Sequence, residues 1–246
     1  MYWQSGEEAM PARISIRDGT WDDGEMTTGH IDRRSADLPA VTRDDVRDAA
    51  LTLFAERGYM GTSLKEVAQR LGLRTPSLYN HIDSKASLLS EIVLDTLEHV
   101  TDDFNRAMSE VDGYVGKLRA ATEVYALRHA THRRQALVVN QDTTHLEEPD
   151  RSVAQDIRRR HEKAFRQIII DGRREGVFTV ESPKLASFAI REMCVSIARW
   201  FRDDGEMTPQ DVARQYGDYA LHIVGVDETV TADRQDGRRS PNVTHA

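Results

Sequence analysis

The sequence has few of the residues that indicate a secreted, membrane-bound or disulfide-stabilised protein. Cys194 is the only cysteine among 246 residues, which excludes an intrachain disulfide and a cysteine-based zinc site. No stretch approaches the roughly 18 consecutive apolar residues of a membrane span. The N-terminus carries acids where a signal peptide has an apolar core. These absences predict a soluble cytoplasmic protein that has no membrane partner.

Sequence motifs of catalysis are also missing. There is no GxSxG, phosphate loop or dinucleotide fingerprint. His129 and His132, with Asp142 and His145 nearby, resemble a metal-ligand pattern because residues three apart share a helix face. HExxH is absent, however, and nine histidines make chance pairs expected. We therefore expect no enzyme, cofactor or metal site, and an enzyme with a histidine-based metal site is the alternative.

Charge is unevenly distributed along the chain. The formal net charge is −8, and residues 1–40 carry four Arg against eight Asp and Glu. Residues 62–90 reverse this balance, with Lys65, Arg70, Arg74 and Lys85 against Glu66 and Asp83. A locally basic segment in an acidic protein predicts a small, salt-sensitive contact with DNA rather than general coating of nucleic acid.

The same basic segment has the layout of a DNA-reading helix-turn-helix. Ser63 can cap a first helix, and Glu66, three residues later, can bond back to it. Gly72 ends that helix. Thr75 is then the expected N-cap of a second helix with Pro76 at its first position.

The second helix of this motif is expected to bury Leu78 and Ile82, which lie one turn apart. Hydroxyl, amide and aromatic groups are left on its outer face, where they suit insertion into a major groove. With the capping serine, the predicted DNA-facing residues are Ser63, Arg74, Thr75, Ser77, Tyr79, Asn80 and His81. The alternative is that the two ring side chains only pack the small domain.

Several segments resemble the DNA-binding domain of TetR-family repressors. They are residues 54–59 (FAERGY), 62–68 (TSLKEVA), 77–82 (SLYNHI) and 84–89 (SKASLL). The resemblance runs from about Val41 to Leu94. It implies that Lys85, at the start of the next helix, contacts phosphate, and that Tyr79, Asn80 and His81 contact DNA.

Helical periodicity covers most of the chain from Thr42 onward, with no alternating strands and no repeat. The expected helices span 42–58, 63–71, 75–82, 84–104, 114–130, 133–146, 149–176, 182–201 and 208–224. We predict an all-α fold: a three-helix DNA-binding domain with a helix-turn-helix (39–86), then a larger helical effector-binding and dimerisation domain (87–226). Residues 1–38 and 227–246 are expected to be disordered.

The second half is similar to the ligand domain of KstR-like TetR repressors over roughly residues 117–225. The similarity lies in 138–146 (VVNQDTTHL), 174–178 (REGVF) and 195–209 (VSIARWFRDDGEMTP). It implies a homodimer formed by the last two helices, 182–201 and 208–224. It also implies an effector of the acyl-coenzyme A type.

Polar and aromatic side chains on three expected helices are candidates for the effector pocket. Amides and an imidazole on 137–146 could border an apolar cavity, and an arginine could pair with an anionic group. The candidates are Asn140, Gln141, Thr144, His145, Phe165, Arg166, Arg199 and Trp200. The alternatives are core or dimer-interface packing for Phe165 and Trp200 and a solvated surface for the arginines.

Together these patterns predict a ligand-responsive repressor that binds a double-stranded, palindromic operator as a homodimer. A small hydrophobic or amphipathic effector, such as an acyl-coenzyme A thioester of lipid or sterol catabolism, would release it. One alternative is a TetR-type regulator of an efflux or detoxification gene that senses a neutral lipophilic drug. Another is an adaptor that uses the motif only for packing.

Overall fold

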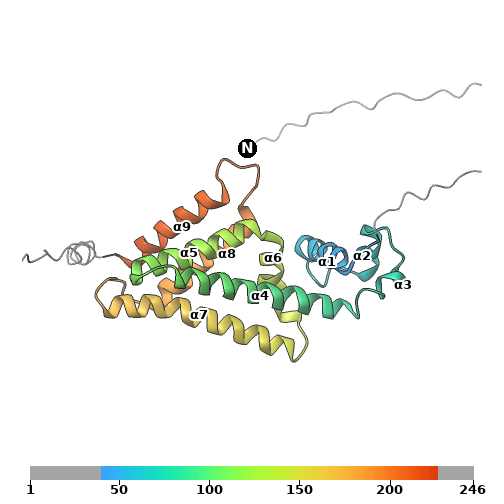
Figure 1. Cartoon of the computed structure of the whole chain (residues 1–246), viewed down its shortest axis with the longest axis horizontal. Helices are drawn as coiled ribbons and strands as arrows, with labels where there is room; N and C mark the ends of the chain where they lie inside the picture. The colour runs from blue at the N-terminus through green and yellow to red at the C-terminus, as the bar shows by residue number, and fades with distance from the viewer. Residues whose placement is uncertain (1–39, 227–246) are drawn as a thin grey trace, which may run out of the picture. The chain divides into compact units, whose positions relative to one another are not determined.

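The computed structural model describes residues 40–226, which form helices joined by short loops (Figure 1). The elements are α1 (Arg43–Arg57), α2 (Leu64–Arg70), α3 (Thr75–Leu78), α4 (Lys85–Ser109), α5 (Gly113–Thr131), α6 (Arg133–Asp142), the 3-10 turn η1 (Thr143–His145), α7 (Asp150–Arg174), α8 (Pro183–Trp200) and α9 (Pro209–Val224). Within this range the extended pairing is one isolated bridge between Phe178 and Val226. The predicted all-α class is confirmed, while the expectations for 1–38 and 227–246 lie outside the described residues.

Helix starts are encoded locally by hydroxyl side chains. Thr42, Ser63, Ser84, Ser182 and Thr208 each occupy the N-cap of a helix, and each accepts a hydrogen bond from a backbone amide of the first turn. These amides have no partner inside the helix, so a capping oxygen stabilises the start by about 1 kcal/mol. The predicted cap at Ser63 is confirmed, and the other four lie at the first residue of the ranges expected for their helices.

The helix expected over 133–146 is shorter than predicted. It ends at Asp142, and η1 continues to His145. The Thr143 hydroxyl donates back to the Val139 carbonyl, and Leu146 N–H donates to the Thr143 carbonyl. Local bonds of this kind compete with α-helical ones, which explains the change to a tighter turn.

The N-terminal half of α4 lies against α1, α2 and α3 (Figure 1). One hydrophobic core fills this region, with Phe54 and Leu89 fully buried. The same core includes Val138 of α6, Leu146 and Ala154 of α7. The two predicted domains therefore share one packed core. The boundary between residues 86 and 87 stays a proposal, which divides the DNA-binding role from the effector-binding role.

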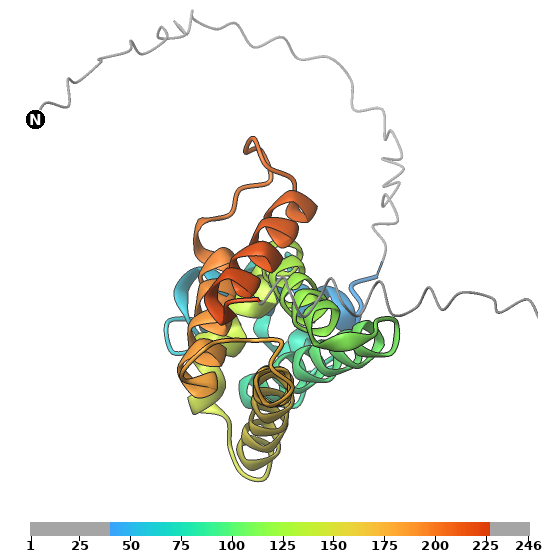
Figure 2. The same ribbon diagram turned by 90° about the vertical axis from the view of Figure 1, so that its left-hand side faces the viewer.

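The C-terminal half of α4 packs with α5 and α7, and α5 packs in turn on α8 and α9 (Figure 2). Phe104, Phe165 and Phe178 are buried in this second core. Gly172 of α7 admits the Phe178 ring so closely that an added Cβ would collide with it. The tight fit fixes the loop after α7 against the bundle.

Candidate DNA-binding surface and effector cavity

Ser63 and Glu66 form the predicted capping box at the start of α2. Glu66 N–H donates to Ser63 Oγ (3.3 Å), and Ser63 N–H donates to a Glu66 carboxylate oxygen (2.8 Å). This carboxylate is held charged, because bonds from the Ser63 amide and hydroxyl lower the Glu66 pKa. Gly72 then turns the chain with φ +69°, a conformation that glycine adopts without strain. The start of α3 is thereby brought next to α2.

The start of α3 differs from the prediction. Arg74, with extended ψ of 144°, is the N-cap, and Thr75 and Pro76 are already helical. Thr75 makes no capping bond, so its assignment as the N-cap was wrong. The α-helix ends at Leu78, and hydrogen-bonded turns continue it, with His81 N–H donating to the Leu78 carbonyl (2.9 Å). Proline is tolerated here because first-turn amides need no helical partner.

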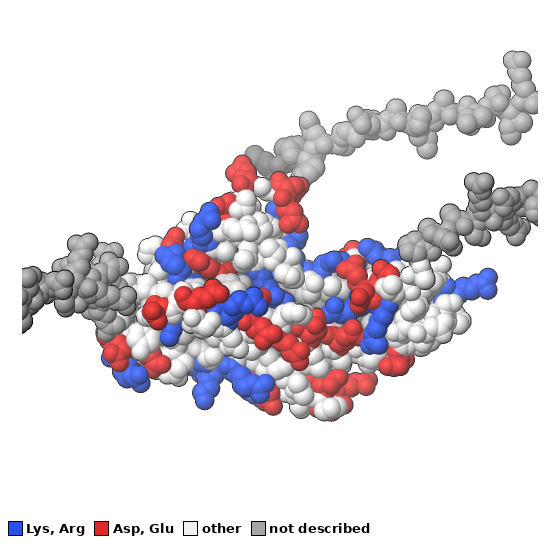
Figure 3. Space-filling view, in the orientation of Figure 1, with Lys and Arg blue, Asp and Glu red and all other residues white. Residues whose placement is uncertain are grey.

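The residues predicted to face DNA differ in exposure. Arg74, Asn80 and Ser63 are exposed, as is Tyr79, whose exposed fraction is 54%. Thr75, Ser77 and His81 are half-buried. On the face in Figure 3, acidic and basic side chains are interspersed rather than forming one basic field. DNA contact by these residues is a proposal, supported by their common position on α2, α3 and the turns that adjoin them.

Lys85 has an internal role that the sequence did not predict. Its ammonium donates to the carbonyls of Tyr59 (2.9 Å) and Thr62 (2.8 Å), and lies 4.1 Å from the centre of the Tyr59 ring. Two of its three N–H groups therefore hydrogen-bond the α1–α2 loop to the start of α4. One N–H is left for the proposed phosphate contact.

Helix α1 is held by ion pairs on two sides. Arg43 pairs with Glu91 of α4 (2.7 Å), and Arg47 pairs with Asp95 of the same helix. From α6, Arg134 pairs with Asp48 (3.0 Å). A displacement of α6 relative to α4 would therefore act directly on α1.

A cavity lies between α4, α5, α6, α7 and α8. Its volume is about 50 Å³, and it adjoins a wider hollow of about 550 Å³ between α4 and α7. Thr101, Ile157 and His161 line both spaces. The remaining cavity walls include Leu97, Val100, Tyr125, Arg128, His129, His132, Val139, Asn140, Arg158 and Arg191.

The structure brings Asn140 alone of the eight predicted effector residues to this cavity. Gln141 and Thr144 line a separate hollow that Asn140 also borders, and His145 stacks on Tyr59. The other four lie elsewhere: Phe165 is in the core, Arg166 pairs with Glu162, Arg199 is exposed, and Trp200 stacks on Tyr216.

The cavity histidines missed as effector candidates are neutral in the folded protein. Burial lowers the pKa of His129 to about 4, and the pKa of His161 to about 4, where Arg191 adds to the effect. His129 Nδ1 lies 2.8 Å from the Tyr125 carbonyl. Among the residues described, no group of three or more His, Cys, Asp or Glu could hold a metal ion.

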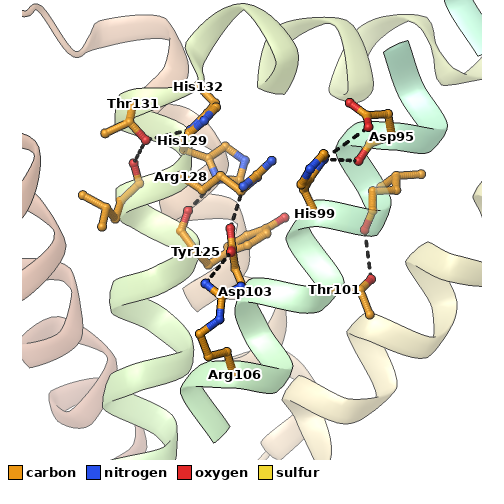
Figure 4. Close-up of polar contacts among 12 residues, drawn as sticks. Asp95, His99, Thr101, Asp103, Arg106, Tyr125, Arg128, His129, Thr131 and His132 are labelled. Carbon is orange, nitrogen blue, oxygen red and sulfur yellow. Dashed lines mark hydrogen bonds and ion pairs between the residues drawn. The ribbon is translucent and has the colours of Figure 1, made fainter. Parts of the chain in front are cut away.

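Figure 4 shows how α4 and α5 meet beside His129 and His132. Arg128 of α5 pairs with Asp103 of α4 (2.5 Å), and the Asp103 carboxylate also faces Arg106. The pairing offsets only part of the Arg128 charge, because burial and then this charge lower the pKa of the cavity residue His132. Cys194 is buried, and burial raises its thiol pKa. From 40 to 226, no helix is long and apolar enough to cross a membrane.

Both halves of the chain match models of known protein families. Residues 46–92 match the model described as "Bacterial regulatory proteins, tetR family", and residues 112–224 match "Tetracyclin repressor-like, C-terminal domain". The TetR-family regulator PfmR from Thermus thermophilus is 34% identical, with a TM-score of 0.64 over 72% of this chain and 97% of PfmR. The chain belongs to the TetR family. It is a transcriptional regulator and not an enzyme, which removes the alternative built on His129, His132 and His145.

Other relatives agree with the predicted subgroup. The HTH-type transcriptional repressor KstR2 of Rhodococcus jostii is 29% identical over 178 residues, which cover 71% of this chain and 86% of KstR2. The structure of AibR in complex with isovaleryl coenzyme A and operator DNA has the same fold, with 20% identity and a TM-score of 0.65 over 75% of this chain and 99% of AibR. The predicted similarity to KstR-like repressors is confirmed.

Proposed function

We propose that this protein is a repressor that binds a palindromic operator as a homodimer and leaves it when an amphipathic effector enters the α4–α8 cavity. The observation that carries the proposal is the cavity itself, because the end of α6 joins its wall to the loop before α2 by hydrogen bonds. The similarity to the KstR2 repressor supports repression. The coenzyme A complex of AibR supports a thioester as the effector.

The proposed connection from cavity to DNA begins at Arg158. This cavity residue of α7 donates to the Val139 carbonyl (3.1 Å) and to the Thr143 hydroxyl (3.4 Å), at the end of α6. Asp142, between them, accepts a hydrogen bond from the Tyr59 amide (3.2 Å). The Tyr59 carbonyl in turn binds Lys85, the first residue of α4.

An effector that displaces Arg158 would free the end of α6 and with it the loop before α2. Operator half-sites lie about one helical turn, roughly 34 Å, or a multiple apart. A change in the separation of two α3 segments therefore spoils their simultaneous fit to DNA. The ligand shifts the equilibrium only by its preference for the released conformation.

The proposed dimer interface is the outer face of α8 and α9. It exposes large apolar side chains that a monomer would leave in water: Leu185, Phe188, Trp200, Tyr219 and Ile223. Exposed apolar patches of this kind mark association surfaces. Placing the two copies through α8 and α9 leaves both α3 segments free to meet DNA.

The test is retardation of a palindromic fragment from upstream of the gene by the full-length protein. Micromolar acyl- and steroid-coenzyme A thioesters should release the fragment and raise the melting temperature, because they bind only the folded state. Release by neutral lipophilic drugs, with no effect of the thioesters, would instead indicate a regulator of efflux or detoxification. Failure to retard any such fragment would contradict the repressor model.

A further inference from the structure

His161 of α7 is the ionisable residue, among those described, that lines both the narrow cavity and the wider hollow. Its exposed fraction is 9%, and neither ring nitrogen finds a hydrogen-bond partner among the described residues. The ring meets Phe104 edge-on (4.9 Å between centres) and tilts against Tyr125 (5.4 Å). It therefore sits in an aromatic setting that a phenylalanine would also fill.

A buried polar group without a partner costs about 1–3 kcal/mol. An imidazole in this position is thus unfavourable for folding alone, and its two nitrogens are available to a ligand. In the neutral ring, one nitrogen donates and the other accepts. His129, in the same cavity, differs because its Nδ1 lies against the Tyr125 carbonyl.

Arg191 of α8 adds donors to the same cavity. Its side chain is 15% exposed, and its buried Nε, like that of Arg128, has no hydrogen-bond partner within the described part of the chain. The ion pair with Glu162 is long, at 3.8 Å. This guanidinium is therefore held less firmly than that of Arg128, which pairs with Asp103 at 2.5 Å.

The size of the spaces limits what can reach these groups. A volume of about 50 Å³ accepts a carbonyl or carboxyl group, since one water occupies about 30 Å³ in the liquid. The hollow of about 550 Å³ can take the larger part of an effector. His161 lines both and stands where the two parts would join.

We infer that His161 and Arg191 bind a carbonyl or carboxylate oxygen on the buried end of the effector, so that the protein selects oxo-acyl or dicarboxylic compounds over plain alkyl chains. The neutral imidazole and the guanidinium both donate to this oxygen. The inference rests on the proposed effector cavity and specifies the chemistry that the cavity selects.

Three coenzyme A thioesters test the selection by calorimetry on the full-length protein: hexanoyl, its analogue with a keto group near the chain end, and adipoyl. The two oxygen-bearing ligands should bind at least about tenfold more tightly than hexanoyl-coenzyme A, because a hydrogen-bonding site rejects an analogue that lacks the group. A stronger preference for adipoyl would identify a carboxylate, and one for the keto analogue a carbonyl. Equal binding of all three would overturn the inference while leaving the proposed function intact.

Variants of His161 and Arg191 test whether these residues cause the preference for oxygen-bearing thioesters. His161→Phe should reduce the preference to within about threefold, and His161→Gln, which keeps a donor and an acceptor, should retain part of it. Arg191→Met should weaken adipoyl most. His99→Gln is the matched control, since His99 is exposed on α4 and meets Asp95. A preference that survives in His161→Phe would contradict the assignment.

Absence of binding by all three thioesters would remove short acyl chains from the proposed effector class. Two small compounds then test the inference about His161. Cyclohexanone and cyclohexane differ by one carbonyl oxygen and are small. Cyclohexanone alone should raise the melting temperature of the wild type, and His161→Phe should abolish that rise. Equal effects of the two compounds on both proteins would refute the inference.

Discussion

At the scale of single residues, Lys85 and Tyr79 should separate DNA contact from stability. Lys85 holds two carbonyls of the α1–α2 loop, whereas the Tyr79 side chain projects into solvent. Lys85→Met should weaken operator binding and also lower the melting temperature by several degrees, because hydrogen bonds from a charged group stabilise by about 1.5–3 kcal/mol each. Tyr79→Ala should weaken operator binding alone.

Fluorescence anisotropy with labelled operator and thermal unfolding measure these two properties on the same samples. The outcome that would contradict the model is an unchanged melting temperature in Lys85→Met. Unchanged operator affinity in both variants would remove these residues from the proposed DNA-binding surface.

The buried histidines should make stability depend on acid. Their pKa values of about 4 in the folded protein lie below the ordinary value of 6.5. Between these two values the unfolded chain binds more protons, so the free energy of unfolding falls as pH drops from about 6.5 towards 4 and is fully retained above that range. Each unit of difference corresponds to about 1.4 kcal/mol.

His161→Phe should therefore lose less thermal stability than the wild type between pH 7 and pH 5. Scanning calorimetry across that interval measures the difference. His99→Gln again serves as the control, because His99 is exposed. If the melting temperatures of the wild type and His161→Phe fall in parallel between pH 7 and pH 5, His161 is not buried in its neutral form.

At the scale of elements, the end of α6 is the proposed connection between effector and DNA. Arg158→Met should leave effector affinity within a few-fold of the wild type. It should reduce the effect of effector on operator affinity at least fivefold, because coupling between sites is a free energy that specific contacts carry. The reason is the loss of the bonds from Arg158 to the Val139 carbonyl and the Thr143 hydroxyl.

Arg159→Met is the matched control for this prediction, since Arg159 is exposed and pairs with Asp156 in its own helix. Operator titrations with and without saturating effector give the coupling directly. If Arg158→Met retains full coupling, the signal does not pass through the end of α6.

Elements whose limits depend on local chemistry were predictable from the sequence. The hydroxyl caps at Ser63, Ser84 and Thr208 needed only neighbouring residues, and each lies where it was expected. The start of α3 was misassigned because Thr75 is a better capping residue than Arg74, yet the turn after Gly72 places Arg74 in the extended conformation. Tertiary geometry decided between the two.

The effector cavity was much less predictable. Tyr125, His161 and Arg191 come from α5, α7 and α8, and their convergence depends on how these helices pack. No spacing in the sequence indicates it. His129 and His132 were noticed for a metal pattern, but they belong to the cavity wall. The available signal was the presence of histidine and arginine on otherwise apolar helix faces.

At the scale of the whole molecule, the exposed apolar face of α8 and α9 should determine the oligomeric state. Phe188 and Tyr219 are 61% and 46% exposed, so a charge at either site leaves the fold of its own chain intact. The double variant Phe188→Asp, Tyr219→Asp should be monomeric and bind operator at least about tenfold more weakly, because a buried, unpaired charge costs several kcal/mol. Ile197, fully buried within its own chain, is unsuitable for this test.

Light scattering at several concentrations gives the mass. Met60→Asp changes an equally apolar, exposed residue next to the DNA-binding helices and should remain dimeric. A soluble, fully dimeric double variant would place the interface on another face.

Because α4 is long, a small tilt of this helix at the cavity would displace its first turn, next to the DNA-binding helices, by a larger distance. With 25 residues at about 1.5 Å each, this helix is a lever of about 37 Å. Its C-terminal half borders the cavity, and its first residue, Lys85, holds the DNA-binding loops. A tilt of about 5° about the far end moves the first turn by about 3 Å, close to the 3.4 Å per base of DNA. In the proposed symmetric dimer the two displacements would add, and such a tilt would change the fit to the operator by more than one base pair.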